Sequence, residues 1–444
     1  MAVGTVLQCP TLKFELLIQL VKTMALPSLA QARQSAVRAL ALAVLVGLPF
    51  LFIPLAQSQT YQVIHKFAYA DGYHPSSTVV MDAGGKLYGT TYQGGSADRG
   101  TVFRLARSGS GWILSTLYMF QGGADGAYPA AGIIFGPDGA LYGTTSQGGD
   151  PSCGDCGTVF RLQPPASICG SISCPWTKTA IHLFGGTLQG FDGRVPVGDI
   201  AFDRAGNLYG AASRGGQYDD GMVYQLTRSG NNWTETVVHS FTNMFGYPQA
   251  GVTIGSNGNL YGTVQFAVGA NFGAIYQLAP SGMSWTLEDL YHFQQGGGGY
   301  PRAGMIFDAA GNLYGATTSF GDNGGGTAFE LSPVNGGWSY SVLYSFVGNN
   351  GGPDATLTFD QSGNLYGTTG ADGAHQLGSV FKLTHNGGAW SYASLYDFQD
   401  AGVAAYPQSN VLIDSSGNLY GTFSRGWTPY LCPDGCGGVW EITP

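Results

Sequence analysis

Charged side chains are scarce in this sequence, and basic ones are the scarcer kind. Only 10% of the 444 residues are charged, and 18 Lys and Arg stand against 27 Asp and Glu, for a formal net charge of −9. A surface of this sign repels the phosphates of nucleic acids and gives anionic lipids no basic face to bind. We therefore expect neither nucleic acid nor a membrane surface as a partner.

The motifs of common catalytic sites are also missing. The sequence contains no Walker loop, nucleophile elbow or HExxH helix, and no Asp-x-Asp-x-Asp-Gly calcium loop. Glutamate is rare beyond residue 59, whereas glycoside hydrolysis requires two carboxyl groups about 5 to 10 Å apart. No cofactor is expected, although loop aspartates leave calcium binding open. The interpretation leans away from an enzyme.

Long apolar runs are absent apart from one near the N-terminus. Ala39–Ala56 is uncharged and follows two arginines, which is typical of a secretory signal peptide cleaved after Ser58. An uncleaved membrane anchor is the alternative, because the run is just long enough to span a bilayer. Met24 would start a more ordinary signal peptide than the first residue does. We divide the chain into a signal peptide, 1–58, and a single domain, 59–444, located outside the cytoplasm (secreted, periplasmic or at the cell surface).

A repeated tripeptide dominates the rest of the sequence. Leu-Tyr-Gly begins at Leu87, Leu141, Leu208, Leu260, Leu313, Leu365 and Leu419. Most of the intervals are close to 53 residues, and one is longer because of an insertion. The 72 glycines and 13% aromatic residues supply tight turns and strand positions. A unit of this length cannot bury its apolar face alone, so the copies must stack on one another.

Each unit resolves into four strand-like segments, A to D. In the fifth unit they are 304–307, 313–317, 328–331 and 340–346, and a turn at 308–312 joins A to B. Four short strands per unit of this length are typical of a propeller blade. The sequence therefore predicts an all-β, seven-bladed β-propeller of four-stranded blades.

The ends of the repeat region predict how the ring closes. The domain opens with a D-type strand at 61–67 that has no A, B or C strand before it, and it ends with A, B and C but no D. The N-terminal strand is expected to pair into the last blade. This closure removes two sheet edges that would otherwise expose unpaired backbone groups.

The recurrent elements G-N-L-Y-G-T-T, G-T-V-F-[KR]-L and L-Y-x-F resemble the GloVer-type tandem-repeat (choice-of-anchor) family of exported bacterial proteins. The resemblance covers residues 61–442. It implies export, repetition and, in many members, a C-terminal anchoring segment. Because Pro444 comes two residues after the last expected strand, attachment through such an anchor is not expected here. The resemblance assigns no catalytic residue.

Six cysteines remain beyond the predicted cleavage site. They form three close pairs, Cys153 with Cys156, Cys169 with Cys174, and Cys432 with Cys436. The four cysteines of the second unit also suggest a zinc site, but an expected strand places the two pairs on opposite sides of the blade. Local disulfides in an oxidising compartment are favoured, and no metal site is expected.

Internal repetition also separates structural residues from functional ones. His65, His182 and His239 stand where other units have tyrosine, two residues before the phenylalanine that ends strand D, so we interpret them as packing residues. The seven Leu-Tyr-Gly tyrosines are interpreted in the same way, as core residues. A residue that every blade contains is a residue that the blade itself needs.

We therefore expect site residues in the loops between D and A and between B and C, which share one face around the central channel. The candidate ligand-binding residues are Asp71, His74, Asp125, Tyr128, Asp192, Arg194, Tyr247, Tyr300, Arg302, His375, Arg425 and Trp427. Aromatic, acidic and arginine side chains around a shallow opening suit a polar ligand such as a carbohydrate. Turn formation is the alternative for each aspartate that precedes a glycine.

These observations favour a monomeric binding or scaffold module for an extracellular glycan or another component of the cell envelope. The alternative is a carbohydrate-active lyase or hydrolase with its site at the channel mouth. A purely structural envelope protein is the third hypothesis. All three rest on fold analogy and loop composition, because one fold hosts many functions.

Overall fold

The computed structural model describes residues 59–444, apart from residues 76, 166–174, 186–191, 268, 270, 349–350, 400–401, 403, 427–431 and 433–434. The predicted signal peptide therefore lies outside the described residues, as do Cys169, Cys174 and Trp427. The described residues belong to one compact unit, Gln59–Pro444. No helix among them is both long and apolar enough to cross a membrane.

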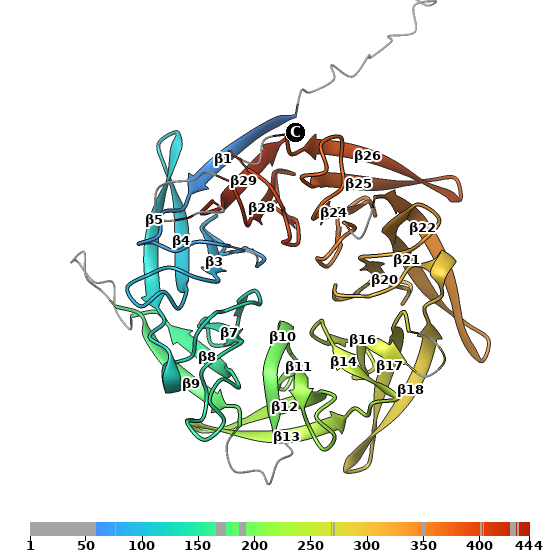
Figure 1. Ribbon diagram of the computed structural model, residues 1–444, viewed down its shortest axis with the longest axis horizontal. Coiled ribbons are helices and arrows are strands. Elements are labelled where there is room, and N and C mark those ends of the chain that lie inside the picture. Colours follow the sequence, from blue (N-terminus) through green and yellow to red (C-terminus); the bar gives the residue numbers. More distant parts are fainter. Residues whose placement is uncertain are drawn as a thin grey trace, which may run out of the picture. The chain divides into compact units, whose positions relative to one another are not determined.

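Seven antiparallel sheets follow one another around a ring in the described part of the chain, as the sequence predicted (Figure 1). We number these blades one to seven in chain order. Within each blade the first strand lies on the side of the ring axis and the last strand lies at the rim (Figure 1). In the fourth blade, two inner strands, β14 and β15, pair with the same neighbour, β16.

The strand bounds, from inner to outer, are as follows. Blade one has β2 (Val80–Met81), β3 (Leu87–Thr91), β4 (Thr101–Ser108) and β5 (Gly111–Met119). Blade two has β6 (Ile134–Phe135), β7 (Leu141–Thr145), β8 (Thr158–Gln163) and β9 (Thr177–Leu183). Blade three has β10 (Gly193–Phe202), β11 (Leu208–Gly215), β12 (Met222–Ser229) and β13 (Asn232–Ser240). Blade four has β14 (Phe245–Pro248), β15 (Thr253–Ile254), β16 (Leu260–Ala267), β17 (Ala274–Ser281) and β18 (Ser284–His292).

Blade five has β19 (Ile306–Phe307), β20 (Leu313–Thr317), β21 (Gly324–Val334) and β22 (Gly337–Val347). Blade six has β23 (Thr358–Phe359), β24 (Leu365–Thr369), β25 (Ser379–Asn386) and β26 (Ala389–Asp397). Blade seven has β27 (Leu412–Ile413), β28 (Leu419–Phe423), β29 (Gly438–Thr443) and β1 (Thr60–Lys66). Two short 3-10 turns, η1 (Gly123–Asp125) and η2 (Gln295–Gly297), lie in the loops that follow β5 and β18.

The N-terminal strand completes the last blade, which confirms the predicted closure. Strand β1 pairs antiparallel with β29, from Thr60 opposite Thr443 to Lys66 opposite Gly438. Figure 1 shows the blue first strand beside the red last strands. The pairing leaves the β29 edge covered and joins the two ends of the domain.

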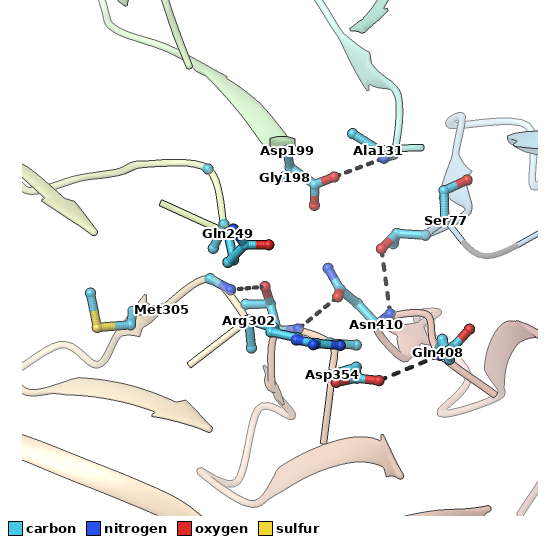
Figure 2. A pocket seen from close by; sticks show the side chains of 18 of the residues that line it. Ser77, Ala131, Gly198, Asp199, Gln249, Arg302, Met305, Asp354, Gln408 and Asn410 are labelled. Atoms are coloured by element: carbon cyan, nitrogen blue, oxygen red, sulfur yellow. Dashed lines mark hydrogen bonds between the residues drawn. The ribbon is translucent and has the colours of Figure 1, made fainter. Parts of the chain in front are cut away.

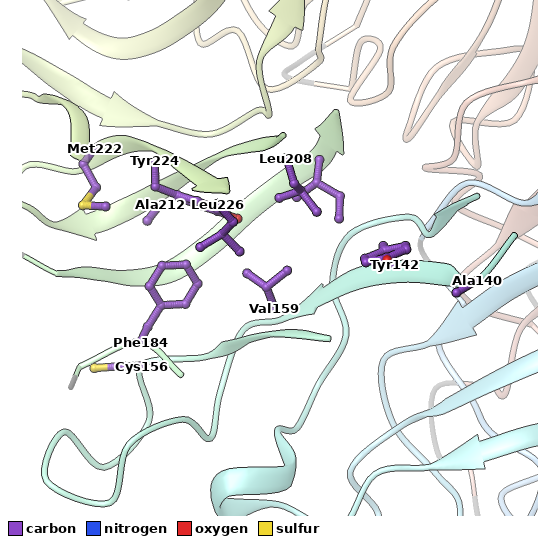
Figure 3. Close-up of a cluster of buried hydrophobic side chains, with 11 residues drawn as sticks. Ala140, Tyr142, Cys156, Val159, Phe184, Leu208, Ala212, Met222, Tyr224 and Leu226 are labelled. Carbon is purple, nitrogen blue, oxygen red and sulfur yellow. The ribbon is translucent and has the colours of Figure 1, made fainter. Parts of the chain in front are cut away.

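The core lies between neighbouring blades, and the repeated tyrosines belong to it. All seven are buried, with Tyr366 the most exposed at 9%. Six of them donate a hydrogen bond from the hydroxyl to the aspartate of the turn before their strand, as Tyr314 does to Asp308 at 3.2 Å. Figure 3 shows one such core, where Phe184 and Val159 of blade two meet Tyr224 and other side chains of blade three. The tyrosines are therefore structural.

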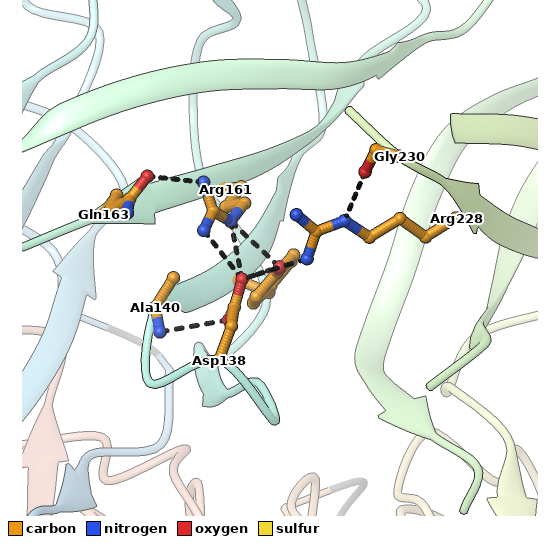
Figure 4. A network of polar contacts seen from close by, with 7 residues as sticks. Asp138, Ala140, Arg161, Gln163, Arg228 and Gly230 are labelled. Atoms are coloured by element: carbon orange, nitrogen blue, oxygen red, sulfur yellow. Dashed lines mark hydrogen bonds and ion pairs between the residues drawn. The ribbon is translucent and has the colours of Figure 1, made fainter. Parts of the chain in front are cut away.

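The turns between the first and second strands also join blades. Asp138, in the turn after β6, binds Arg161 of its own blade, with Nη2 to Oδ2 at 2.7 Å. Arg228 of blade three reaches the same oxygen at 3.4 Å (Figure 4). Arg161 holds the pKa of the Asp138 carboxyl below its ordinary value, even though burial acts in the opposite direction.

A second connection recurs on the opposite side of the ring, and we call it the loop latch. In six blades the residue before a loop proline has a positive φ of 53° to 61°, and its backbone N–H donates to a carbonyl of the preceding blade. Tyr128 N, for example, lies 2.8 Å from Arg99 O. The six residues are His74, Tyr128, Val195, Tyr247, Tyr300 and Tyr406. The latch thus fixes each loop to the preceding blade. The donating residue has a backbone conformation that costs free energy for any residue other than glycine.

Candidate functional site

The loops that follow the outer strands and the loops between second and third strands share one face, which we call the loop face. Isolated bridges join the two loop types in four blades, for instance Tyr73 to Gln93 and Ala405 to Arg425. The hairpin turns lie on the other side, the turn face. The predicted location of both loop types on one face is therefore confirmed.

A cavity of about 420 Å³ occupies the ring axis at the loop face. All seven blades contribute to its wall, each through the segment that runs from the loop proline into the innermost strand. In Figure 2, Asp199, Gln249, Arg302, Asp354 and Asn410, which come from five different blades, lie around this common space. The channel is therefore the place where residues far apart in the sequence meet.

The first and the third residue after the loop proline line the cavity in most of these segments. At the first position the lining residues are Ala130, Gln249, Arg302, Asp354 and Gln408, whereas Val197 of blade three pairs with Ala211 in its own sheet and does not line the cavity. The third carries Thr78, Gly132, Asp199, Gly251, Gly304, Thr356 and Asn410. The side chains at these positions differ from blade to blade, so the wall is polar at the first position of blades four to seven and apolar at the first position of blade two.

Arg302, Asp354 and Gln408 form the polar side of the cavity mouth. The Gln408 Nε2 atom donates to Asp354 Oδ2 at 3.4 Å. Burial raises the pKa of the Asp354 carboxyl, and this outweighs the opposing effect of the Arg302 charge and the Gln408 amide. The Arg302 guanidinium is exposed. A cation, a carboxyl and an amide thus converge at one opening.

Deeper in the channel, side chains at the third position bind backbone groups of neighbouring blades. Gly304 N donates to Thr356 Oγ1 at 3.0 Å, and Thr356 N donates to Asn410 Oδ1 at 2.8 Å. Asp199 accepts from Gly132 N at 2.9 Å, and burial raises the pKa of its carboxyl. These contacts tie blades together and leave a carboxyl group inside the channel.

Two further hollows adjoin the cavity on the loop face. One, of about 490 Å³, is lined by Tyr247, Arg214 and Gln249, and the Arg214 guanidinium lies 4.8 Å from the centre of the Tyr247 ring. The other, of about 310 Å³, is lined by Tyr300, Arg302 and neighbours that it shares with the cavity. Together they extend the polar opening outward over blades three to six. A hollow of about 1170 Å³ lies on the turn face, between blades three and five.

The predicted site residues fall into three groups. Tyr247, Tyr300 and Arg302 line the cavity or the adjoining hollows. The other described ones line none of these three. Trp427 lies outside the described residues.

The three aspartates lie in the loops against the outer strands, where they bind backbone N–H groups. Asp71 accepts from Ala68 N at 2.7 Å, Asp125 from Gln121 N at 2.7 Å, and Asp192 from its neighbour in the loop, Gly193 N, at 2.7 Å. Each aspartate also faces the aromatic residue two places before the repeated phenylalanine at the end of the outer strand, such as Tyr118 before Phe120, whose hydroxyl donates to Asp125 at 2.6 Å. These contacts agree with the alternative in which the three aspartates form turns.

The remaining predicted residues stand around the outer loop face. Arg194 pairs with Asp219, and the Arg425 guanidinium lies over the Tyr406 ring at 5.0 Å. His375 is exposed. His74 and Tyr128 occupy loop-latch positions, as Tyr247 and Tyr300 also do. The repeat therefore fixes the backbone conformation at these four positions, and only the type of side chain differs from blade to blade.

Cysteine bonding follows the prediction where the chain is described. Cys153 is bonded to Cys156, and Cys432 to Cys436. Both pairs hold loops that precede a third strand on the loop face. The predicted Cys169–Cys174 bond lies outside the described residues.

Sequence reasoning overlooked four residues that the structure places in the channel, Asp199, Gln249, Gln408 and Asn410. Their signal was present in the sequence, because each stands one or three places after a loop proline. Finding them requires the knowledge that this segment faces the axis. That knowledge depends on the three-dimensional packing and not on the repeat alone.

Comparison with known proteins supports the fold and the repeat. A family model described as a Gloeobacter/Verrucomicrobia repeat matches residues 50–246 and 196–431. No curated protein matches the sequence. A polysaccharide lyase of the PL25 ulvan lyase family is similar in structure, with a TM-score of 0.52 and 11% identity over 85% of this chain and 95% of that one. The extracellular domain of a one-component system from B. thetaiotaomicron has a TM-score of 0.53 and 10% identity, over 86% of this chain and 40% of that one. At such identities the likeness is one of fold alone.

Proposed function

The chain belongs to the Gloeobacter/Verrucomicrobia repeat family and folds as a seven-bladed propeller, and from this premise we propose that its channel mouth binds a polar extracellular ligand of the carbohydrate class. One observation carries the proposal. The repeat does not restrict the first position after the loop proline to one type of residue. In blades four to seven this position carries the polar side chains that line the cavity, Gln249, Arg302, Asp354 and Gln408. The fold does not require a polar residue at this position, because blade two carries Ala130 there and Ala130 also lines the cavity.

The chemistry of the opening suits sugar hydroxyl and carboxylate groups. The Arg302 guanidinium offers several N–H donors, the Asp354 carboxyl accepts, and the two glutamine amides can do both. The rings of Tyr247 and Tyr300, in the adjoining hollows, offer flat faces for an apolar sugar face. We place this activity outside the cytoplasm, as the N-terminal segment suggests, with the protein acting as a monomeric binding or scaffold module.

The experiment measures retention of the purified chain on a panel of neutral and acidic polysaccharides, with a count of new chain ends from pH 4 to 9. We expect retention on at least one polymer, weakened at least tenfold by Arg302→Ala or Asp354→Asn, because each removes a charged hydrogen-bonding group worth about 1.5–3 kcal/mol. Arg228→Ala, which removes an exposed guanidinium on the turn face, is the matched control and should bind normally.

The outcomes separate the hypotheses. Retention without new ends, lost in the channel variants alone, supports the binding module. Release of new ends that depends on Asp199 or Asp354 would instead assign a carbohydrate-active enzyme to the same site. Failure of every polymer to bind, or equal loss in Arg228→Ala, overturns the proposal.

A further inference from the structure

Each pair of neighbouring blades meets at the rim through one recurring pair of side chains. One lies two residues before the phenylalanine that ends the outer strand, and the other lies six residues before the equivalent phenylalanine of the next blade. At three junctions both are tyrosines, and their rings stack at 3.7 to 4.5 Å between centres. These junctions define what the repeat normally builds at this place.

The junction between blades two and three departs from this pattern. His182 of β9 takes the first position and Glu235 of β13 takes the second, and Asp192 of the intervening loop joins them. The His182 Nε2 atom lies 3.4 Å from Asp192 Oδ1 and 3.7 Å from Glu235 Oε2. A packed aromatic pair has thus been replaced by an imidazole and two carboxyl groups.

These three groups are removed from water and incompletely satisfied. The exposed fractions of the side chains are 15% for His182, 6% for Asp192 and 2% for Glu235. Both carboxyl oxygens of Glu235 are buried without a hydrogen-bond donor in the described structure. Burial and the neighbouring Asp192 carboxyl raise the pKa of Glu235. Two buried carboxyl groups side by side can both be ionised only when a positive charge lies beside them.

The preceding junction shows how the same place is filled when the chain supplies that charge itself. There Lys178 stands six residues before its phenylalanine, at the position that Glu235 occupies in the next blade. Its Nζ atom lies 3.0 Å from Asp125 Oδ1, and its side chain is 4% exposed. The ammonium group is a buried cation beside the loop aspartate. At the His182 junction the ion pairs of Asp192 and Glu235 within the described residues involve His182 alone.

We propose that His182, Asp192 and Glu235 bind a divalent transition-metal ion such as Zn²⁺ between the second and third blades. Imidazole nitrogen and carboxylate oxygen are the ligands that zinc accepts together. The three ligand atoms lie within 4.8 Å of one another. A tetrahedral ion about 2.0–2.2 Å from each ligand would hold them about 3.4 Å apart, which two of the distances already approach.

The surroundings orient at least one ligand for this role. Asp192 accepts Gly185 N at 2.8 Å through Oδ2 and Gly193 N at 2.7 Å through Oδ1, which fixes the plane of its carboxylate. Such hydrogen bonds to a ligating carboxylate hold it in position for the metal. Three protein ligands leave a coordination position for water. The ion would join blade two to blade three at the place where three other junctions have stacked tyrosines.

The test is calorimetric titration of the chelator-treated full chain with Zn²⁺, with Ca²⁺ titrated separately. We expect one zinc site per chain in addition to any weaker surface binding, and no comparable calcium binding. His182→Tyr and Glu235→Leu restore residues that other blades carry at these positions, so folding, checked by circular dichroism, should survive. Loss of an orienting residue weakens metal binding by about 10–100-fold, so loss of a ligand should weaken it by more than about 100-fold.

The matched control is His65→Tyr. His65 takes the first position at the junction between blades seven and one, where it faces Asp71 at 3.7 Å, but leucine stands at the second position and the described part of the chain offers no third ligand there. Zinc binding should be unchanged in this variant. Zinc binding that persists in both His182→Tyr and Glu235→Leu, absence of zinc binding by the wild type, or a preference for calcium would each overturn the proposal.

Discussion

At the scale of single residues, the recurring pair at the blade junctions shows how one backbone position accepts different chemistry. Histidine replaces tyrosine two residues before the strand-ending phenylalanine in three blades, as the sequence indicated, and its ring packs against that phenylalanine. The His239 ring lies edge-on to Phe241, with 5.0 Å between ring centres, as the Tyr291 ring does to Phe293 at 5.5 Å. Packing is thus conserved between the two residue types, but the response to pH is not.

His239→Tyr should make the protein less sensitive to acid. Burial lowers the pKa of His239 in the folded protein below the ordinary value of about 6.5 that the unfolded chain retains. Protons therefore bind the unfolded state more strongly, and wild-type stability falls as the pH drops below that ordinary value. Tyrosine has no titration there. Urea unfolding from pH 8 to pH 5 should show a shallower loss of unfolding free energy for the variant.

The same experiment contains its own control. At pH 8 the imidazole is neutral in both states, so any difference between the two proteins there reports packing alone. Profiles that run parallel from pH 8 to pH 5 would mean that His239 is as accessible to protons in the folded state as in the unfolded one. The packing interpretation of this histidine would then be wrong.

At the scale of elements, the second strand of each blade was the part most fully predicted. The Leu-Tyr-Gly signature begins every one of these strands, and the glycine lies opposite an aromatic residue of the third strand, as Gly315 lies opposite Phe329. A Cβ atom on Gly315 would lie 2.5 Å from the Phe329 ring. The glycine is repeated because the ring occupies the space of a side chain.

Gly315→Ala should therefore destabilise the domain by about 1–3 kcal/mol, the usual cost of overpacking a core. The lost free energy of unfolding can be measured by urea denaturation. Gly337→Ala is the matched control, since a Cβ there meets nothing within 4 Å. We expect that change to alter stability by less than about 1 kcal/mol. Equal effects of the two substitutions would contradict the packing role of the repeated glycine.

The first strand of each blade was predicted less well. In blade five the sequence predicted a strand over 304–307, whereas β19 comprises only Ile306 and Phe307. The first two residues of the predicted strand, 304 and 305, do not belong to β19. The Gly304 N–H instead faces the channel, where it donates to the Thr356 side chain of the next blade and not to a ladder partner. Such contacts join residues about fifty positions apart, so the strand propensity of a single segment does not predict them.

At the scale of the whole molecule, the number of blades and the ring closure followed from the sequence, but the channel did not. Repetition is a local signal, and a count of strand types at the two ends was enough to predict how the ring closes. The cavity wall instead combines one short segment from each blade. Its chemistry depends on which of seven equivalent side chains face one another, as Arg302 and Asp354 do, and this emerges only when the blades are arranged around the axis.

The closure carries a buried polar network centred on Glu441. Glu441 of β29 is fully buried and accepts from Gln62 of β1 at 2.6 Å and from Tyr420 at 2.9 Å, and it pairs with Arg107 of blade one. A carboxylate in such a place is stable only while its donors remain. The first strand thus supplies both a backbone ladder and a donor to a buried charge.

Removal of residues 59–67 should consequently open the ring. The β29 edge would be exposed and Glu441 would lose one donor, so we expect a lower unfolding temperature together with self-association through the free edge.

Gln62→Ala, which keeps the strand but removes the amide, is the control and should lower the free energy of unfolding by only about 1.5–3 kcal/mol without self-association. Light scattering and thermal unfolding distinguish the two variants. A synthetic peptide of residues 59–67 should restore the monomer, because it can form the same backbone ladder with β29, from Thr60 to Lys66. A truncated chain that stays monomeric and unfolds at the wild-type temperature would show that six complete blades hold the ring without the N-terminal strand.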